Sequence, residues 1–129
     1  MQIHQSAEDY LETILMLTQR MGRVRSIDVV NELGFTKASV SIAMKKLREN
    51  GYIAVDGEGN LTLLEPGREI AERIYSRHRL LTHFFMQLGV DEKPAAEDAC
   101  KAEHILSEQT LEKIRESALR TDAAAQEDE

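Results

Sequence analysis

The strongest constraint on the fold is a pair of short helix patterns separated by a tight turn. Ser26 can cap the first helix and Gly34 is well placed to end it, while Thr36 can cap the second, which ends at Gly51. Two short helices joined by a glycine-containing turn predict a helix-turn-helix. The apolar positions that recur at helical spacing are Ile27, Val30 and Leu33 in the first helix and Val40, Ala43, Met44 and Leu47 in the second.

A hairpin pattern follows the second of these helices directly. Residues 52–55 are strand-like, residues 56–60 have the composition of a turn, and residues 61–64 provide a returning strand. We interpret this hairpin as the wing of a winged helix-turn-helix.

Longer helix patterns flank the winged segment. A first helix is predicted over residues 6–20, where Ser6 and Asp9 resemble a capping box. A long helix is predicted over residues 66–88, because Pro66 suits a first helical turn and apolar residues then recur at helical spacing.

The remaining chain predicts two further helices and a tail. A fifth helix covers about residues 94–106, and Ser107 can cap a sixth. The acidic tail has no large apolar side chain, so we expect it to be disordered. The predicted fold is therefore mainly α, with an N-terminal winged helix-turn-helix domain that has a two-stranded wing (residues 1–73), a C-terminal all-helical domain (74–120) and a disordered acidic tail (121–129).

Charge is unevenly distributed along the 129 residues. The formal net charge is −7, yet residues 20–50 carry +4 and the remainder carries −11. An acidic protein with one polyanion-binding face shows this layout. No apolar run approaches the roughly 20 residues needed to span a bilayer, and the first residues lack a secretory signal. We therefore expect a cytoplasmic protein with no membrane partner.

The second helix of the helix-turn-helix has a polar and basic face opposite its apolar stripe. Hydroxyls and small apolar groups near its N-terminal end can contact base edges in a major groove, and basic groups suit phosphates. We predict that double-stranded DNA is the partner, bound through Lys37, Ala38, Ser39, Ser41, Ile42, Lys45, Lys46 and Arg48.

Potential metal ligands occur in three groups that are far apart in sequence. Two carboxylates are spaced i, i+3 on the first helix, an imidazole falls on the apolar stripe of the long helix, and a thiol, a carboxylate and an imidazole stand at i, i+3 and i+4 on the fifth. Each group alone has a commoner explanation, such as a helix cap, a core histidine or a small buried cysteine. Together they suit one divalent first-row ion, or two nearby ions. The six residues are Asp9, Glu12, His78, Cys100, Glu103 and His104.

Four stretches carry a specific family resemblance: SAEDYLETILML, SIDVVNELGFTKASVSIAMKKLRENGYI, GNLTLLEPGREIAERIYSRHRLL and CKAEHILSE. Over residues 6–120 the chain resembles the family of the diphtheria toxin repressor and the manganese transport regulator. The resemblance implies a homodimeric, metal-activated winged-helix repressor of metal-uptake genes, which binds palindromic operator half-sites and uses residues 74–120 for dimerisation and metal binding. Its short form, without the SH3-like domain of the iron-responsive branch, is similar to the manganese regulators.

The resemblance also implies that the six residues above are direct metal ligands, with departures from both branches. The manganese branch has a carboxylate where this chain has Cys100, and the iron branch has Met where this chain has Asp9. An ancillary site of the iron branch would need a carboxylate at Thr82 and an imidazole at Ala96, so we do not expect that site here. A carboxylate able to bridge two ions is missing, which leaves one ion or two as alternatives.

The donor types bear on the identity of the metal. Carboxylates and imidazoles accept Mn(II), whereas a thiolate favours softer or borderline ions. Fe(II) is therefore our first choice of cofactor and Mn(II) a close second, while Zn(II) or Co(II) can bind in vitro. Because Asp9 and Glu12 belong to the winged domain and the other four ligands to the C-terminal domain, we expect the metal to join the two domains in an arrangement that fits DNA.

The dimer interface is predicted from surplus apolar positions. Ile105, Leu111 and Ile114 are among more apolar residues than one helical pair can bury, so we assign them to a two-fold interface. The alternative is that they pack on the long helix of their own subunit.

Two other functions compete with metal-dependent repression. A metal-independent winged-helix regulator could respond to an organic ligand or to oxidation of Cys100. A metal-dependent hydrolase is disfavoured because all six donors are used as ligands, so we expect neither enzymatic activity nor a small organic substrate.

Overall fold

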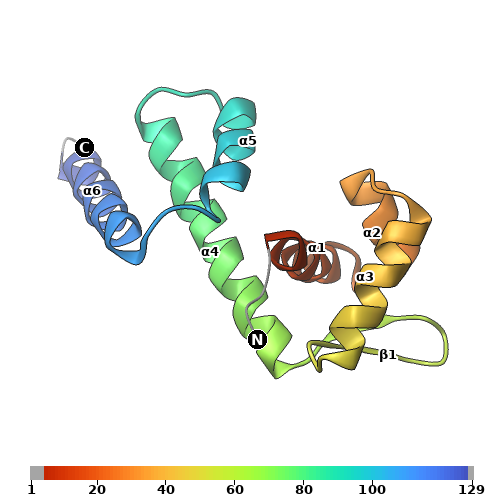
Figure 1. Ribbon diagram of the computed structural model, residues 1–129. Helices are drawn as coiled ribbons and strands as arrows, with labels where there is room; N and C mark the ends of the chain where they lie inside the picture. The colour runs from red at the N-terminus through yellow and green to blue at the C-terminus, as the bar shows by residue number, and fades with distance from the viewer. Residues whose placement is uncertain (1–4, 128–129) are drawn as a thin grey trace. The chain divides into compact units, whose positions relative to one another are not determined.

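The computed structural model describes residues 5–127, which form helices and one hairpin in the predicted order (Figure 1). The boundary between two compact units falls inside the long helix, between Arg73 and Ile74. The elements are α1 (Gln5–Met21), α2 (Ser26–Leu33), α3 (Lys37–Glu49), β1 (Ile53–Val55), β2 (Leu61–Leu63), α4 (Glu65–Gln87), α5 (Glu92–Ala102) and α6 (Glu108–Glu127).

The first unit is built around the apolar side of α1. α1 contacts α2, α3 and β2, and α2 contacts α3, so the predicted helix-turn-helix is confirmed (Figure 1). The inward stripe predicted for α3 is also confirmed at Val40, Met44 and Leu47, which are all buried. In α2 the predicted stripe is wrong at Ile27, which is 43% exposed, and Val29 is fully buried instead.

The helix caps of this unit are partly as predicted. The Thr36 hydroxyl accepts a hydrogen bond from the Ser39 N–H at 3.1 Å, so Thr36 is the N-cap of α3. Ser26 is not the cap of α2 but its first residue. The N-cap is Arg25, whose backbone N–H donates to the Asp28 carboxylate at 2.9 Å. Ser6 likewise lies inside α1, which already includes Gln5.

The wing is a two-stranded antiparallel hairpin. Ile53 pairs with Leu63 and Val55 with Leu61, so the predicted hairpin is confirmed. The turn is closed by Asp56, whose carboxylate accepts hydrogen bonds from the backbone and the side chain of Asn60. Those bonds lower the pKa of Asp56 below its ordinary value, because they favour the charged carboxylate.

The second unit contains the rest of α4 with α5 and α6. Its buried centre consists of Leu81, Ala99 and Leu111, one residue from each helix, with Ile114 packed against them. Leu111 is only 2% exposed, so it follows the alternative of packing within one subunit and our interface assignment for it is wrong. Ile114 is half-buried against the same cluster. Ile105 remains 76% exposed.

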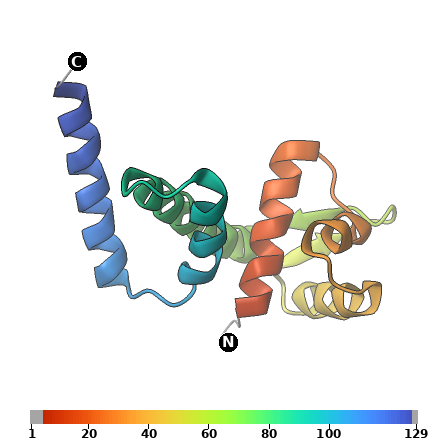
Figure 2. The ribbon, with the colours of Figure 1, turned by 90° about the horizontal axis from the view of Figure 1, so that it is seen from above.

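Two helix ends in this unit differ from prediction. α5 ends at Ala102, so Glu103 and His104 lie in the following turn and not on a helix face. α6 continues to Glu127 as one helix (Figure 2), which contradicts the predicted disorder of residues 121–127; residues 128–129 lie outside the described range.

Contacts with α4 explain why α6 continues as a helix beyond residue 120. His83 Nε2 lies 3.1 Å from the Asp122 carboxylate, and the Gln87 amide donates to the same carboxylate at 2.9 Å. Ala118 is buried one turn earlier. These contacts with α4 stabilise the helical end of α6, which has too few large apolar side chains to be held by burial alone.

Among the described residues, none of the helices is both long and apolar enough to cross a bilayer.

The start of α4 generates a prediction for stability. A Cβ on Gly67 would collide with the backbone carbonyl oxygen of Tyr52, which is itself held by a 3.0 Å hydrogen bond from the Leu64 N–H. Gly67→Ala should therefore lower the free energy of unfolding by about 1–3 kcal/mol, measured by urea denaturation. Gly57→Ala is the matched control, because a Cβ there meets no atom within 4 Å. Equal stability of the two variants would contradict this packing.

Candidate metal centre and nucleic-acid interface

The predicted DNA-binding face of α3 is open to solvent. All eight predicted residues, Lys37, Ala38, Ser39, Ser41, Ile42, Lys45, Lys46 and Arg48, are exposed. Ile42, in the middle of the helix, is 58% exposed even though it is a large apolar side chain. The buried stripe on the opposite side orients this face outward, so its hydroxyl, methyl and basic groups can all reach a ligand.

A shallow hollow of about 250 Å³ adjoins the same face. In its lining, Lys45 and Arg48 supply positive charge and Ser41 supplies a hydroxyl. Ser26, the first residue of α2, is also part of the lining. Sequence reasoning used Ser26 as a helix cap and missed its place in this lining. The hollow extends the basic surface from α3 to the start of α2, where backbone N–H groups also favour anions.

The second unit brings three predicted metal ligands together. Glu103 is 0% exposed, and its two carboxylate oxygens face different imidazoles. Oε2 lies 3.1 Å from His78 Nδ1, and Oε1 lies 3.4 Å from His104 Nε2. The side chain of His104 is also buried, whereas that of His78 is 21% exposed.

The cluster of His78, Glu103 and His104 suits a divalent cation. Two ligands bonded at about 2.1 Å to one ion lie about 3 Å apart, which is close to the separations found here. A carboxylate buried without full charge compensation is costly, and a cation would supply that compensation. Imidazole and carboxylate together are donors for first-row transition metals.

The other three predicted ligands have different surroundings. Asp9 and Glu12 lie one turn apart on α1 in the first unit, where Asp9 is half-buried and Glu12 is buried. A buried carboxylate on α1 is unusual for a helix whose other buried side chains are mainly apolar. Cys100 is exposed on α5, and among the described residues it does not belong to a group of three donors within 4.8 Å of one another.

Arg77 is a second residue that sequence reasoning missed. Its side chain is only 15% exposed, and Nη1 donates to the backbone carbonyl of Glu103 at 3.2 Å. α4 contains four arginines, and nothing in their spacing distinguishes Arg77 from Arg68, Arg73 or Arg79. Burial beside the Glu103 turn is what distinguishes it.

Comparisons with known proteins agree over nearly the whole chain. Residues 2–61 match a family model described as the N-terminal DNA-binding domain of iron-dependent repressors, and residues 64–121 match one described as their metal-binding and dimerisation domain. A helix-turn-helix transcriptional regulator of Methanocaldococcus jannaschii, itself uncharacterised, is 36% identical over 86% of this chain and 90% of its own length. The regulator MntR of Bacillus subtilis is 34% identical over 84% of this chain and 77% of its own.

Solved structures are similar as well. A manganese-dependent transcriptional repressor in complex with manganese has a TM-score of 0.79 at 27% identity, covering 87% of this chain and 52% of that protein. The manganese regulator SloR has a TM-score of 0.74 at 26% identity, covering 90% and 54%. This chain therefore spans about half the length of these solved proteins.

Removal of the Glu103 carboxylate should destabilise the metal-free protein. Glu103→Ala removes the carboxylate that lies 3.1 Å from His78 Nδ1, so the free energy of unfolding should fall by roughly 1–3 kcal/mol in urea denaturation with chelator present. Glu112→Ala, at an exposed position of α6, should stay within about 0.5 kcal/mol of the unmodified protein. If Glu103→Ala were as stable as this control, the carboxylate would not be paired as described.

Proposed function

Because the chain belongs to the diphtheria toxin repressor and manganese transport regulator family of metal-dependent DNA-binding transcriptional repressors, we propose that it represses metal-uptake genes when a divalent metal ion is bound. The observation that carries the proposal is the fully buried Glu103 carboxylate between two imidazoles. That arrangement suits a cation, and it lies in the region matched by the metal-binding domain of the family.

The proposed ligand set contains donors from both units. The first unit, which carries α3, supplies two carboxylates, and the second supplies two imidazoles, one carboxylate and one thiol. Carboxylate oxygens are good ligands for hard metal ions, and imidazole and thiolate extend the set to borderline ions. The six residues are Asp9, Glu12, His78, Cys100, Glu103 and His104.

Fe(II) is our first candidate for the metal and Mn(II) a close second. The thiol of Cys100 favours Fe(II), whereas the remaining donors accept either ion. The matched family models are described as iron-dependent repressors, and one similar solved repressor is a complex with manganese. Zn(II) and Co(II) are expected to bind in vitro, since the affinity of such sites follows the Irving–Williams order.

Joint ligation explains how metal binding would control DNA binding. A bound divalent cation supplies positive charge to carboxylates that otherwise repel one another and DNA. Asp9 and Glu12 belong to the DNA-binding unit, so holding them with the donors of the second unit removes conformational freedom between the units. We propose that this favours the arrangement in which the α3 helices of two copies enter successive major grooves, about 34–36 Å apart.

Within each half-site, different parts of the α3 face have different roles. Lys45, Lys46 and Arg48 bind phosphates, where positive charge contributes affinity without sequence information. Ser39, Ser41 and Ile42 are placed to contact base edges and thymine methyl groups. A two-fold dimer presents two such faces, so we propose a palindromic operator.

Fluorescence anisotropy on duplexes selected from a random library tests the function. With Mn(II), or with Fe(II) under anaerobic conditions, the unmodified protein should bind selected duplexes at least about tenfold more tightly than with chelator, within the usual range of allosteric coupling. Asp9→Ala and His104→Ala should lose this stimulation while keeping their helical circular dichroism.

Glu112→Ala is the control, because Glu112 is exposed and outside the proposed ligand set. It should respond to metal like the unmodified protein. Equal DNA affinity of the unmodified protein with metal and with chelator would refute metal-dependent repression.

A further inference from the structure

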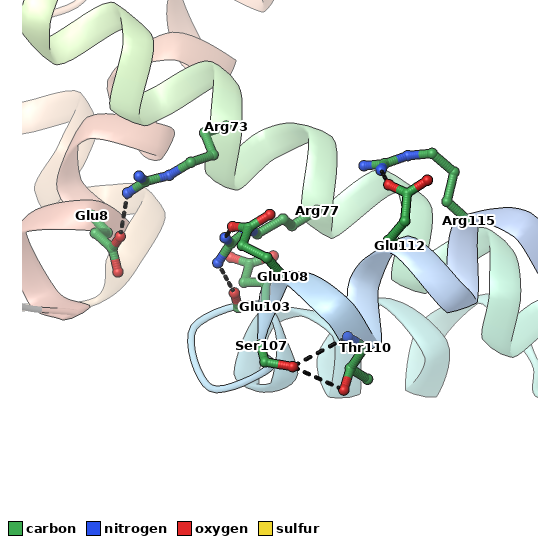
Figure 3. Close-up of polar contacts among 9 residues, drawn as sticks. All are labelled: Glu8, Arg73, Arg77, Glu103, Ser107, Glu108, Thr110, Glu112 and Arg115. Carbon is green, nitrogen blue, oxygen red and sulfur yellow. Dashed lines mark hydrogen bonds and ion pairs between the residues drawn. The ribbon is translucent and has the colours of Figure 1, made fainter.

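Arg77 contacts two consecutive structural segments from a single position on α4. Its Nη1 donates to the backbone carbonyl oxygen of Glu103 at 3.2 Å, and its Nη2 forms an ion pair with the Glu108 carboxylate (Figure 3). Glu103 is the C-cap residue of α5, and Glu108 is the first residue of α6. The guanidinium therefore joins both ends of the connection between these helices to α4.

The carbonyl that Arg77 binds is one that a helix cannot satisfy by itself. The last carbonyls of an α-helix lack intrahelical donors, and they also carry the negative end of the helix dipole. The Glu103 N–H still donates to the Ala99 carbonyl at 2.9 Å, so Glu103 completes the last turn of α5. A guanidinium from α4 thus caps α5 at the point where the chain turns toward His104.

Glu103 is thereby fixed at two points by neighbouring residues of α4. Arg77 binds its backbone carbonyl, and His78, the next residue, lies 3.1 Å from its carboxylate. His104 lies 3.4 Å from the other carboxylate oxygen. Fixing the backbone and the side chain together leaves the carboxylate little freedom to turn away from the two imidazoles.

We propose that Arg77 is a positioning residue, which holds the Glu103–His104 turn in the geometry for metal binding and couples that turn to the first turn of α6 through Glu108. The inference rests on the proposed function, because it assumes that Glu103 and His104 bind a metal. It extends that function to residues outside the ligand set, and it gives metal binding a direct connection to α6 in the domain that the family uses for dimerisation.

Charge and position predict opposite effects of removing Arg77. A guanidinium near a cation site repels the cation, so a purely electrostatic role predicts tighter metal binding when the charge is removed. A positioning role predicts weaker binding, since loss of a residue that orients a ligand commonly costs 10-fold or more in affinity. The ion pair with Glu108 reduces the repulsion, which allows an arginine to be used at this place.

The experiment measures Mn(II) affinity by electron paramagnetic resonance of the free ion, with Arg77→Met, Arg77→Lys and Glu108→Gln variants. Arg77→Met should weaken Mn(II) binding about tenfold, and Glu108→Gln and Arg77→Lys should weaken it by smaller factors. Lys keeps the charge but lacks the planar fork that binds two acceptors at once. The control is Arg115→Met, which removes the arginine of a 2.7 Å ion pair with Glu112 on the exposed surface of α6 (Figure 3) and should leave affinity unchanged.

A second measurement uses the metal-free protein. Amide hydrogen exchange of Glu103, Ile105 and Leu106, whose N–H groups donate to carbonyls of the last turn of α5, should be faster in Arg77→Met and unchanged in Arg115→Met. Unchanged exchange, or Mn(II) binding as tight as or tighter than that of the unmodified protein, would overturn the positioning role. If the unmodified protein bound neither Mn(II) nor, under anaerobic conditions, Fe(II), the proposed function would instead be refuted, and the exchange measurement would still decide whether Arg77 fixes the turn.

Discussion

A carboxylate removed entirely from solvent is the constraint around which the second unit is organised. Glu103 has no exposed surface, and its charge is costly there unless partners compensate it. His78 comes from α4 and His104 from the turn after α5, so compensation requires two segments that are 26 residues apart in sequence to meet. Packing of Leu81 against Ala99 brings these segments together, and the site depends on that apolar contact.

The first unit solves a different problem, which is to present one helix face rigidly to a large ligand. Val40, Met44 and Leu47 anchor α3 in the core, and the Thr36 hydroxyl fixes its start. With that side of α3 buried, its basic and hydroxyl groups face solvent. The +4 carried by residues 20–50, in a chain of net charge −7, is consistent with an acidic protein that binds DNA through one surface.

Much of this fold was predictable because local signals agreed with one another. Thr36, Gly34 and the apolar spacing of α3 all indicated a helix-turn-helix, and two strand-like stretches on either side of a turn composition indicated the hairpin. The predicted cap of α2 was misplaced by one residue. The Asp28 carboxylate accepts a hydrogen bond from the Arg25 N–H, and this favours Arg25 over Ser26 as the N-cap.

Contacts distant in sequence account for the rest of the errors. The i, i+3, i+4 spacing of Cys100, Glu103 and His104 assumed a helix that in fact ends at Ala102. The tail remained helical because His83 and Gln87 contact Asp122, and the role of Arg77 depends on its burial against a turn that is distant in sequence. Composition and periodicity contain no information on such pairs.

We propose that donors from both units bind the same ion, and a nuclear magnetic resonance titration can test this. Diamagnetic Zn(II) would be added to the unmodified protein while the amide signals of Glu12 in the first unit and of Glu103 in the second are followed. If both units bind the same ion, both signals should shift with one dissociation constant and one stoichiometric end point. A response of Glu103 alone, or two separate dissociation constants, would contradict it.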